Sequence, residues 1–178
     1  MNALPSSPSS PSSITRQRRA QAARLLAASP QRHAVAWTDL SLVPDWALGE
    51  RAALDRLAQA VGVRAHAAAL RRCIDGRVLK RLCAELGEPA MHALISDDDA
   101  EIAAMESLDP IEVDIDARLR RTGCDWLLAS VESPVLREAL RELLWPGAGP
   151  SLRALNAKSA QRLVASARAA LDLKEHAA

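Results

Sequence analysis

The fold of this chain is decided by residues 46–95, WALGERAALDRLAQAVGVRAHAAALRRCIDGRVLKRLCAELGEPAMHALI. Apolar residues recur there every three to four positions, which is the spacing of one helix face. Residues that end or begin helices stand between these runs, namely Gly62, Asp75, Gly76, Gly87 and Pro89. We therefore predict consecutive helices over 46–61, 65–74, 76–86 and 90–95. The apolar stripe of the third consists of Val78, Leu79, Leu82, Cys83 and Leu86.

Part of this stretch resembles a known family. Residues 70–95, LRRCIDGRVLKRLCAELGEPAMHALI, with VPDWAL at 43–48, are similar to the SctK/YscK-type accessory (sorting platform) proteins of bacterial type III secretion systems. The shared features are a proline-tryptophan element, an isoleucine-aspartate/glycine turn and a leucine-rich helix that ends in leucine-glycine. The resemblance implies a non-enzymatic cytoplasmic adaptor in a bacterium, peripheral to the inner membrane through its partners. Those partners would be the cytoplasmic domain of the inner-ring protein and the ring-like subunit of the sorting platform.

The amino-acid composition favours an all-α fold independently of this resemblance. The chain has 178 residues with no Phe, no Tyr and four Trp, so Leu, Ala and Val must fill most of the interior. Leu and Ala are good helix formers, and runs of β-branched residues are scarce. We expect a compact array of about seven to eight helices, because that is how many periodic segments the punctuation separates.

The N-terminal segment has a composition unlike that of the rest. Its first thirteen residues include three Pro and six Ser, which cannot bury enough apolar surface to become ordered. We expect residues 1–14 to form a disordered tail and residues 15–178 to form a single helical domain. Five Arg and no acidic residue follow between Thr15 and Arg32. An acid-poor start of this kind is also typical of an organellar transit peptide or of the export signal of a secreted effector.

Residues beyond 95 continue in helices. The alternation at 111–116, IEVDID, by itself favours a strand, but Asp109, Pro110 and Glu112 supply the cap and first turn of a helix. We predict a helix that continues with Ile115, Leu119 and Trp126 on one face. Ser133 and Pro134 begin another, with its inward residues at Val135, Leu136, Ala139, Leu140, Leu143 and Leu144. The last helix is expected from about Asn156 to Leu173, with a stripe of Leu163, Val164, Ala167 and Leu171.

Several classes of function find no support in the sequence. A net charge of +1 gives no global attraction to nucleic acid or to anionic lipid. No apolar segment approaches the roughly 20 residues that span a bilayer. Cys73, Cys83 and Cys124 are expected to be reduced core residues, and the cysteines and histidines lack the short paired spacing of a zinc site.

Catalysis has one weak candidate. His92 could approach Cys83 or Cys73 and form a Cys-His pair, although nothing in the spacing requires it. No glycine-rich loop for phosphate is present either. We therefore expect no enzymatic activity, no cofactor and no bound metal.

DNA binding is the main alternative to an adaptor function. Residues 65–86 can be interpreted as two helices joined by a tight turn, with basic residues at Arg71, Arg72, Arg77, Lys80 and Arg81. A helix-turn-helix usually has a longer turn, and the chain as a whole is nearly neutral. We accordingly expect protein partners and no nucleic acid.

Candidate partner-binding residues follow from their chemistry and position. Trp37, Trp46 and Trp145 lie near segment junctions, where a large ring either fills the core or anchors a partner. The polar candidates are Arg71, Arg72, Asp97, Asp98 and Asp99. For the three aspartates the competing interpretation is a helix first turn, where carboxylates offset the exposed N–H groups.

Overall fold

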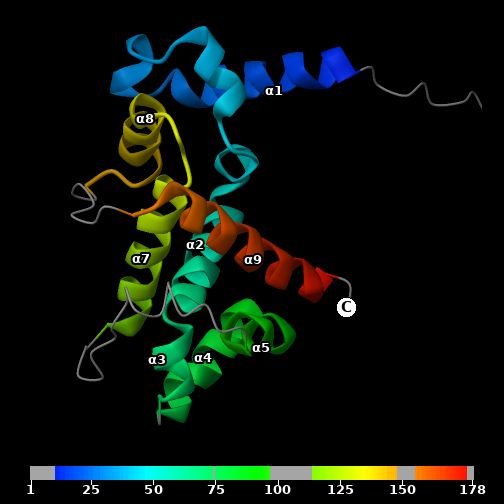
Figure 1. The fold of residues 1–178 in the computed structure, drawn as a ribbon, viewed down its shortest axis with the longest axis vertical. Helices are drawn as coiled ribbons and strands as arrows, with labels where there is room; N and C mark the ends of the chain where they lie inside the picture. The colour runs from blue at the N-terminus through cyan, green and yellow to red at the C-terminus, as the bar shows by residue number, and fades with distance from the viewer. Residues whose placement is uncertain (1–10, 74, 97–113, 148–154, 176–178) are drawn as a thin grey trace, which may run out of the picture. The chain divides into compact units, whose positions relative to one another are not determined.

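The structure is a computed structural model and describes residues 11–73, 75–96, 114–147 and 155–175. Regular structure in these ranges is helical, with no strand among them, so the predicted all-α fold is confirmed. The α-helices are α1 (Pro11–Leu26), α2 (Arg51–Ala65), α3 (Ala67–Arg71), α4 (Gly76–Leu86), α5 (Glu88–Ser96), α7 (Ile115–Ala129), α8 (Pro134–Leu144) and α9 (Ala157–Glu175) (Figure 1). Three short 3-10 helices are η1 (Pro30–His33), η2 (Trp37–Leu42) and η3 (Asp45–Leu48).

The chain divides into two compact units, whereas the sequence predicted one helical domain over 15–178. Unit 1 comprises Met1–Leu48 and Ser133–Ala148, and therefore contains α1, the three 3-10 helices and α8. Unit 2 comprises Gly49–Glu132 and Gly149–Ala178, and contains α2, α3, α4, α5, α7 and α9. Each unit is interrupted in sequence by part of the other, so local periodicity could not reveal the division.

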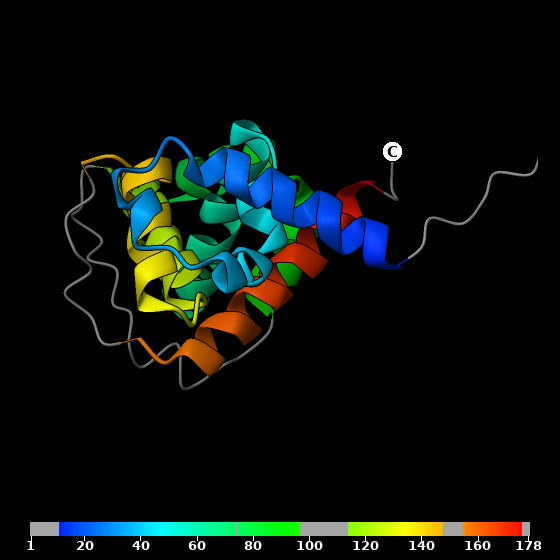
Figure 2. The same cartoon turned by 90° about the horizontal axis from the view of Figure 1, so that it is seen from above.

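Unit 2 is built around the pair α2 and α7, which make the most extensive helix contact in the described chain. Helix α9 packs against α2, α5 and α7, and α4 packs against α5 (Figures 1 and 2). Trp126 on α7 is completely buried in this core. The other buried residues of unit 2 include Leu54, Leu57, Leu119, Leu127 and Leu163. Burying each such side chain contributes roughly 1.5–3 kcal/mol, so this apolar core is the main source of stability in unit 2.

The prediction that the α2 helix ends at Gly62 is wrong. Helix α2 continues to Ala65, and Gly62 lies inside it. A Cβ atom added to Gly62 would lie 1.9 Å from the carbonyl oxygen of Leu119 on α7. This glycine is therefore present because the two helix backbones nearly touch there, which is a tertiary requirement that a helix-stop rule does not recognise.

The predicted boundaries of α4 are confirmed. Asp75 is the N-cap, and its Oδ1 accepts a hydrogen bond of 2.9 Å from the backbone N–H of Arg77. Gly87 ends the helix with φ of 92°, a conformation that side chains disfavour. In the predicted stripe, Val78, Leu82 and Leu86 are buried, whereas Leu79 and Cys83 are half-buried. Helix α5 begins at once, at Glu88.

The start of α7 differs from the prediction. Asp114 is its N-cap and has a non-helical backbone, with Oδ1 accepting from the N–H of Ala117 at 3.0 Å. A helix continuous from residue 111 through 116 is therefore wrong. The capping sequence proposed at Asp109 and Pro110 lies outside the described residues. The sequence alone does not distinguish Asp114 from Asp109 as the cap, because either carboxylate can accept from backbone N–H groups of a first turn.

Unit 1 packs α1, η2, η3 and α8 around a smaller core. Helix α1 begins at Pro11, inside the segment 1–14 expected to be a tail, and Ala22 and Leu26 are its buried residues. Leu40 of η2 and Trp46 of η3 are buried with them, and η2 and η3 contact α1. Helix α8 begins as predicted, with Ser133 Oγ accepting from the N–H of Leu136 at 3.3 Å.

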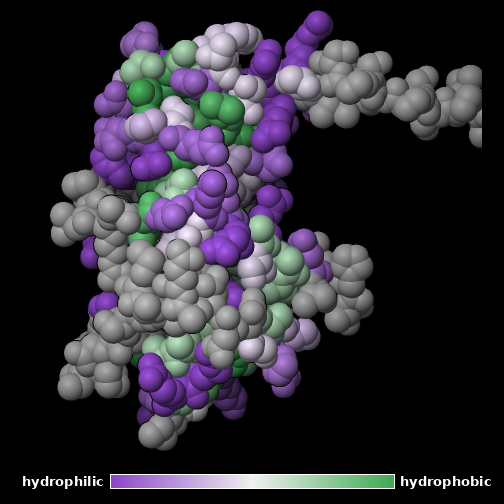
Figure 3. Space-filling model, viewed as in Figure 1, coloured by the Kyte–Doolittle hydropathy of each residue, from purple (hydrophilic) through white to green (hydrophobic). Residues whose placement is uncertain are grey.

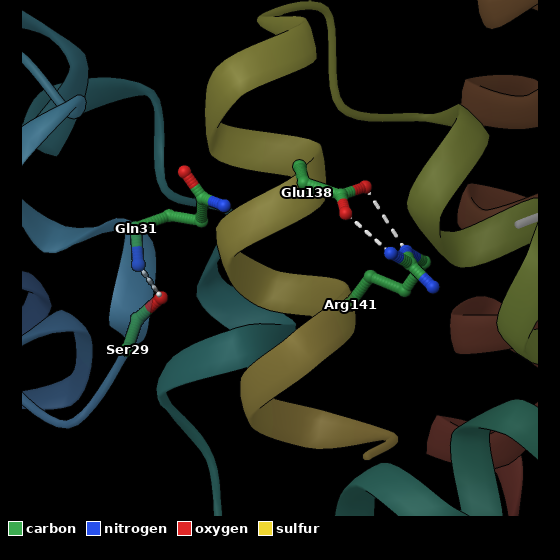
Figure 4. A network of polar contacts seen from close by, with 4 residues as sticks. All are labelled: Ser29, Gln31, Glu138 and Arg141. Atoms are coloured by element: carbon green, nitrogen blue, oxygen red, sulfur yellow. Dashed lines mark hydrogen bonds and ion pairs between the residues drawn. The ribbon is translucent and has the colours of Figure 1, made fainter. Parts of the chain in front are cut away.

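Polar side chains form local contacts on η1 and on α8 in unit 1. Ser29 Oγ accepts a hydrogen bond of 3.1 Å from the N–H of Gln31 and so caps η1 (Figure 4). The Gln31 side chain points toward α8, against which η1 packs. On α8 itself, Arg141 pairs with Glu138 one turn earlier. These contacts stabilise the start of η1 and the C-terminal half of α8.

Candidate interaction surface

The three tryptophans proposed as partner anchors lie in different surroundings. Trp37 is 67% exposed on η2, whereas Trp46 on η3 is only 8% exposed. Trp145, the C-cap residue of α8, is half-buried, and its ring lies 6.4 Å from that of Trp46, centroid to centroid, at an interplanar angle of 37°. Trp46 and Trp145 are thus brought together as a packing pair, and Trp37 is left as the solvent-facing ring.

Exposed large apolar residues of the described chain lie in unit 1. They are Trp37 and Leu42 on η2, at 67% and 55% exposed, and Val135 on α8, at 40%. Figure 3 shows hydrophobic side chains reaching the surface of unit 1 among hydrophilic ones. We call Trp37 and Leu42 the η2 surface. Val135 was predicted to face inward, but the helix turns it outward because Leu136, Ala139 and Leu140 occupy the buried side.

Leu42 is an exposed residue that was not predicted from the sequence. Residues 37–42 are too few for a helical stripe, so no periodicity could assign an exposed side. The available signal was Pro44, which prevents a longer helix from including Leu42 and leaves it near the end of a short turn. Single exposed leucines are common on protein surfaces, and this one matters only because an exposed tryptophan shares its six-residue helix.

Arg18 holds the backbone that follows the η2 surface. Its guanidinium donates to the carbonyl oxygen of Val43 at 2.9 Å and pairs with Asp45 at 3.0 Å. Val43 itself is fully buried. The η2 surface is therefore presented on a segment fastened to α1 at its C-terminal end, which lowers the conformational entropy that binding a partner would cost.

The acidic groups of unit 1 are partly neutralised by its own arginines. Glu138 accepts from Arg141 on the same helix, and this hydrogen bond lowers the pKa of the Glu138 carboxyl (Figure 4). Asp45 is paired with Arg18. Arg16 and Arg24 of α1, in contrast, are exposed. The charge that unit 1 presents to solvent is consequently positive.

Arg71, proposed as a partner-binding residue, instead contacts the end of α5. Its Nη1 donates to the carbonyl oxygen of Ile95 at 2.6 Å. Arg64, one of the few buried charged residues at 5% exposed, donates to the neighbouring carbonyl of Leu94 at 3.2 Å. Two arginines from consecutive helices thus satisfy carbonyl groups that the last turn of α5 leaves without helix partners. Arg72 is exposed, and Asp97, Asp98 and Asp99 lie outside the described residues.

Two further polar contacts involve α7. One joins α7 to His66, the residue at which α2 ends, and the other joins it to Gln59 within α2. Nε2 of His66, the α2 C-cap, lies 3.2 Å from Oγ1 of Thr122, and both side chains are buried. Gln59 Oε1 accepts from Nε of Arg120 at 3.1 Å, and Gln59 is 2% exposed. These residues were not predicted from the sequence, since each looks like a polar interruption of an apolar helix. Their geometry serves helix packing.

The thiols and His92 do not assemble in the described structure. All three cysteines are unpaired with one another and half-buried, whereas core positions were expected for them. Burial, with Asp125 and Asp55 nearby, raises the pKa of Cys124 to about 12, so this thiol is a poor nucleophile. The described contacts of His92 are to Ser96, at 3.4 Å between Nδ1 and Oγ and through its backbone carbonyl.

The described ranges contain neither a cluster suited to a metal ion nor a helix suited to span a membrane. No group of three or more His, Cys, Asp or Glu side chains there is placed to hold a metal ion. None of the described helices has the length and apolarity needed to cross a bilayer. No family model, curated protein or solved structure matches the chain.

Proposed function

We propose that this protein is a non-enzymatic adaptor that binds another protein through the η2 surface of unit 1. One observation carries this proposal, which is the 67% exposure of Trp37. The chain has only four aromatic residues, and leaving one of them in water forfeits about 1.5–3 kcal/mol of burial energy that folding could have used. A partner that covers the ring recovers that free energy, and tryptophan is enriched among residues that dominate binding.

The resemblance of residues 43–48 and 70–95 to the SctK/YscK-type accessory proteins supplies the identity of the proposed partners. On this basis the adaptor links the cytoplasmic domain of the inner-ring protein to the ring-like subunit of the sorting platform, in the cytoplasm of a bacterium. A secreted effector remains an alternative, because the Ser- and Pro-rich start of the chain also fits an export signal.

The contacts of the basic residues support a protein partner over DNA. Of the five proposed for a DNA-binding face, Arg71 donates to Ile95 and Arg81 forms an ion pair of 2.7 Å with Asp116. A guanidinium committed to its own chain is less available to a phosphate. Helix α3, which would be the first helix of a helix-turn-helix, has only five residues, fewer than such a motif uses.

Affinity purification from the native host tests the proposal. The full chain, tagged at its C-terminus, is purified from its own cells, and co-purifying chains are identified by mass spectrometry. Recovery of the inner-ring or sorting-platform subunits in stoichiometric amount is the expected result. Recovery of nucleic acid, or of no protein above the level of an untagged control, would contradict the adaptor function.

A further inference from the structure

The surface of unit 1 combines exposed apolar side chains with an excess of positive charge. Seven arginines and four acidic residues belong to this unit, and α1 contains four of the arginines and no acid. Two of the acids, Asp45 and Glu138, are paired with Arg18 and Arg141. Unit 1 therefore attracts negatively charged partners, and the attraction acts before contact is made.

We propose that the partner of unit 1 is an acidic protein segment with apolar side chains, which covers Trp37 and Leu42 while its carboxylates pair with Arg16 and Arg24. This inference rests on the proposed adaptor function and adds the chemistry of the partner. Helix η2 packs against α1, the helix that carries Arg16 and Arg24, and both of these side chains are exposed. Arginine suits this role, because its planar guanidinium binds a carboxylate through two parallel hydrogen bonds.

The structure favours a protein segment over an anionic bilayer. A helix that lies in a membrane interface presents a continuous apolar face to the lipid. The buried residues of α1, Ala22 and Leu26, are already used in the core of unit 1. Its exposed positions are mostly polar or small, namely Thr15, Arg16, Gln17, Ala20, Gln21 and Arg24. Over the side chains that the structure describes, from Thr15 onward, α1 thus has no free apolar face, and η2 offers two exposed apolar side chains for insertion.

The same surface fits single-stranded nucleic acid poorly. Proteins that bind such strands stack successive bases on several aromatic rings along a basic groove. In unit 1, Trp37 is exposed, but Trp46 is buried and Trp145 is half-buried against it. A single ring cannot provide that repeated stacking, whereas it suffices as the central anchor of a peptide.

Selection from a random peptide library tests this inference without knowledge of the natural partner. Phage that display random 16-residue peptides are selected on the immobilised full chain, with Trp37→Ala/Leu42→Ala protein present in solution as competitor. Enriched peptides are synthesised, and their affinity is measured by fluorescence anisotropy at two salt concentrations. Vesicles of phosphatidylserine and phosphatidylcholine and a 20-nucleotide single strand are measured alongside.

We expect enriched peptides to carry net negative charge together with apolar residues and to bind more weakly at high salt. Arg16→Gln/Arg24→Gln should weaken binding about tenfold and Trp37→Ala about thirtyfold, the usual effects of two exposed ion pairs and of one anchor residue. The matched charge change in unit 2, Arg121→Gln/Arg168→Gln, should leave affinity unchanged, since both side chains are exposed on other helices.

Failure of selection, or enrichment of neutral or basic peptides, would overturn the acidic-partner inference. So would binding of the vesicles or the single strand more tightly than any peptide. The adaptor function itself would survive those results if the host purification still recovered a stoichiometric protein partner. If that purification recovered none, the adaptor function would fail regardless of the peptides.

Discussion

Gly123 on α7 faces the backbone of Ala58 on α2 so closely that a Cβ atom at position 123 would lie 1.7 Å from the Ala58 carbonyl oxygen. Gly62 makes the reciprocal approach to Leu119. Each helix thus contributes one glycine to the same crossing, and the two backbones meet where a side chain would normally separate them. Unit 2 depends on this crossing, because α5 and α9 both pack against α2.

Gly123→Ala should therefore destabilise the protein by at least about 3 kcal/mol, the upper range for overpacking, because backbone atoms rather than a flexible side chain must move. Gly76→Ala is the matched control. A Cβ at Gly76 meets nothing within 4 Å. Gly76→Ala should therefore raise the free energy of unfolding by roughly 0.4–1 kcal/mol, because alanine leaves the unfolded chain fewer conformations than glycine does. Urea denaturation measures both. Equal stability of the two variants would mean that α2 and α7 do not cross as described.

Leu82→Ala should cost about 2–5 kcal/mol of unfolding free energy, since Leu82 is fully buried at the centre of the α4 stripe. Lys80→Ala, two residues earlier and exposed on the same helix, should change stability by no more than about 0.5 kcal/mol. Thermal denaturation of the pair provides the comparison. A negligible cost at Leu82 would indicate that the α4 stripe faces a partner instead of the core.

Arg64→Gln should destabilise more than Arg71→Gln, although both remove a donor to the end of α5. Arg64 is buried, so its loss leaves the Leu94 carbonyl without this donor and away from water, at a cost of about 1–3 kcal/mol. Water can replace the exposed guanidinium of Arg71, and Arg72→Gln should have almost no effect. Hydrogen exchange at the C-terminal turn of α5 should be fastest in Arg64→Gln, slower in Arg71→Gln and slowest in Arg72→Gln. Equal exchange in all three variants would show that this turn does not rely on the two arginines.

Cys124 should resist alkylation in the folded protein. Burial holds its pKa at about 12 against an ordinary 9.0, so at pH 8 its thiolate is rarer by on the order of a thousandfold than in an unfolded chain. Because the folded state holds the proton more tightly, the stability linked to this group is complete below pH 9 and declines as the pH rises toward 12. Iodoacetamide labelling followed by mass spectrometry, with and without urea, measures this difference. Equally rapid labelling of Cys124 in both conditions would refute it.

Sequence reasoning succeeded where a boundary is set by local chemistry. Asp75 and Ser133 cap helices through hydrogen bonds to N–H groups two or three residues away, and Gly87 ends one through its own backbone conformation. It failed where the reason for a residue lies in a distant segment. Gly62 looked like a stop because its partner, Leu119, is far along the chain.

The candidate site shows the same limit. The sequence singled out Trp37, Trp46 and Trp145 together because it gave no measure of exposure. The structure separates them, since Trp46 and Trp145 contact each other while Trp37 faces solvent. Arg71 was assigned to a basic face, and only the position of Ile95 reveals its structural contact. Local pattern identifies residue chemistry, whereas tertiary packing decides which residues remain available.

The most direct test of the adaptor function compares Trp37→Ala with Arg168→Ala in the native host. Both residues are exposed, so each variant should keep its thermal midpoint within about 2 °C of the parent. The quantity measured is the amount of partner that co-purifies per molecule of tagged protein. We predict that Trp37→Ala loses most of the partner while Arg168→Ala retains all of it. Full retention by a folded Trp37→Ala protein would contradict the claim that this chain acts through the η2 surface.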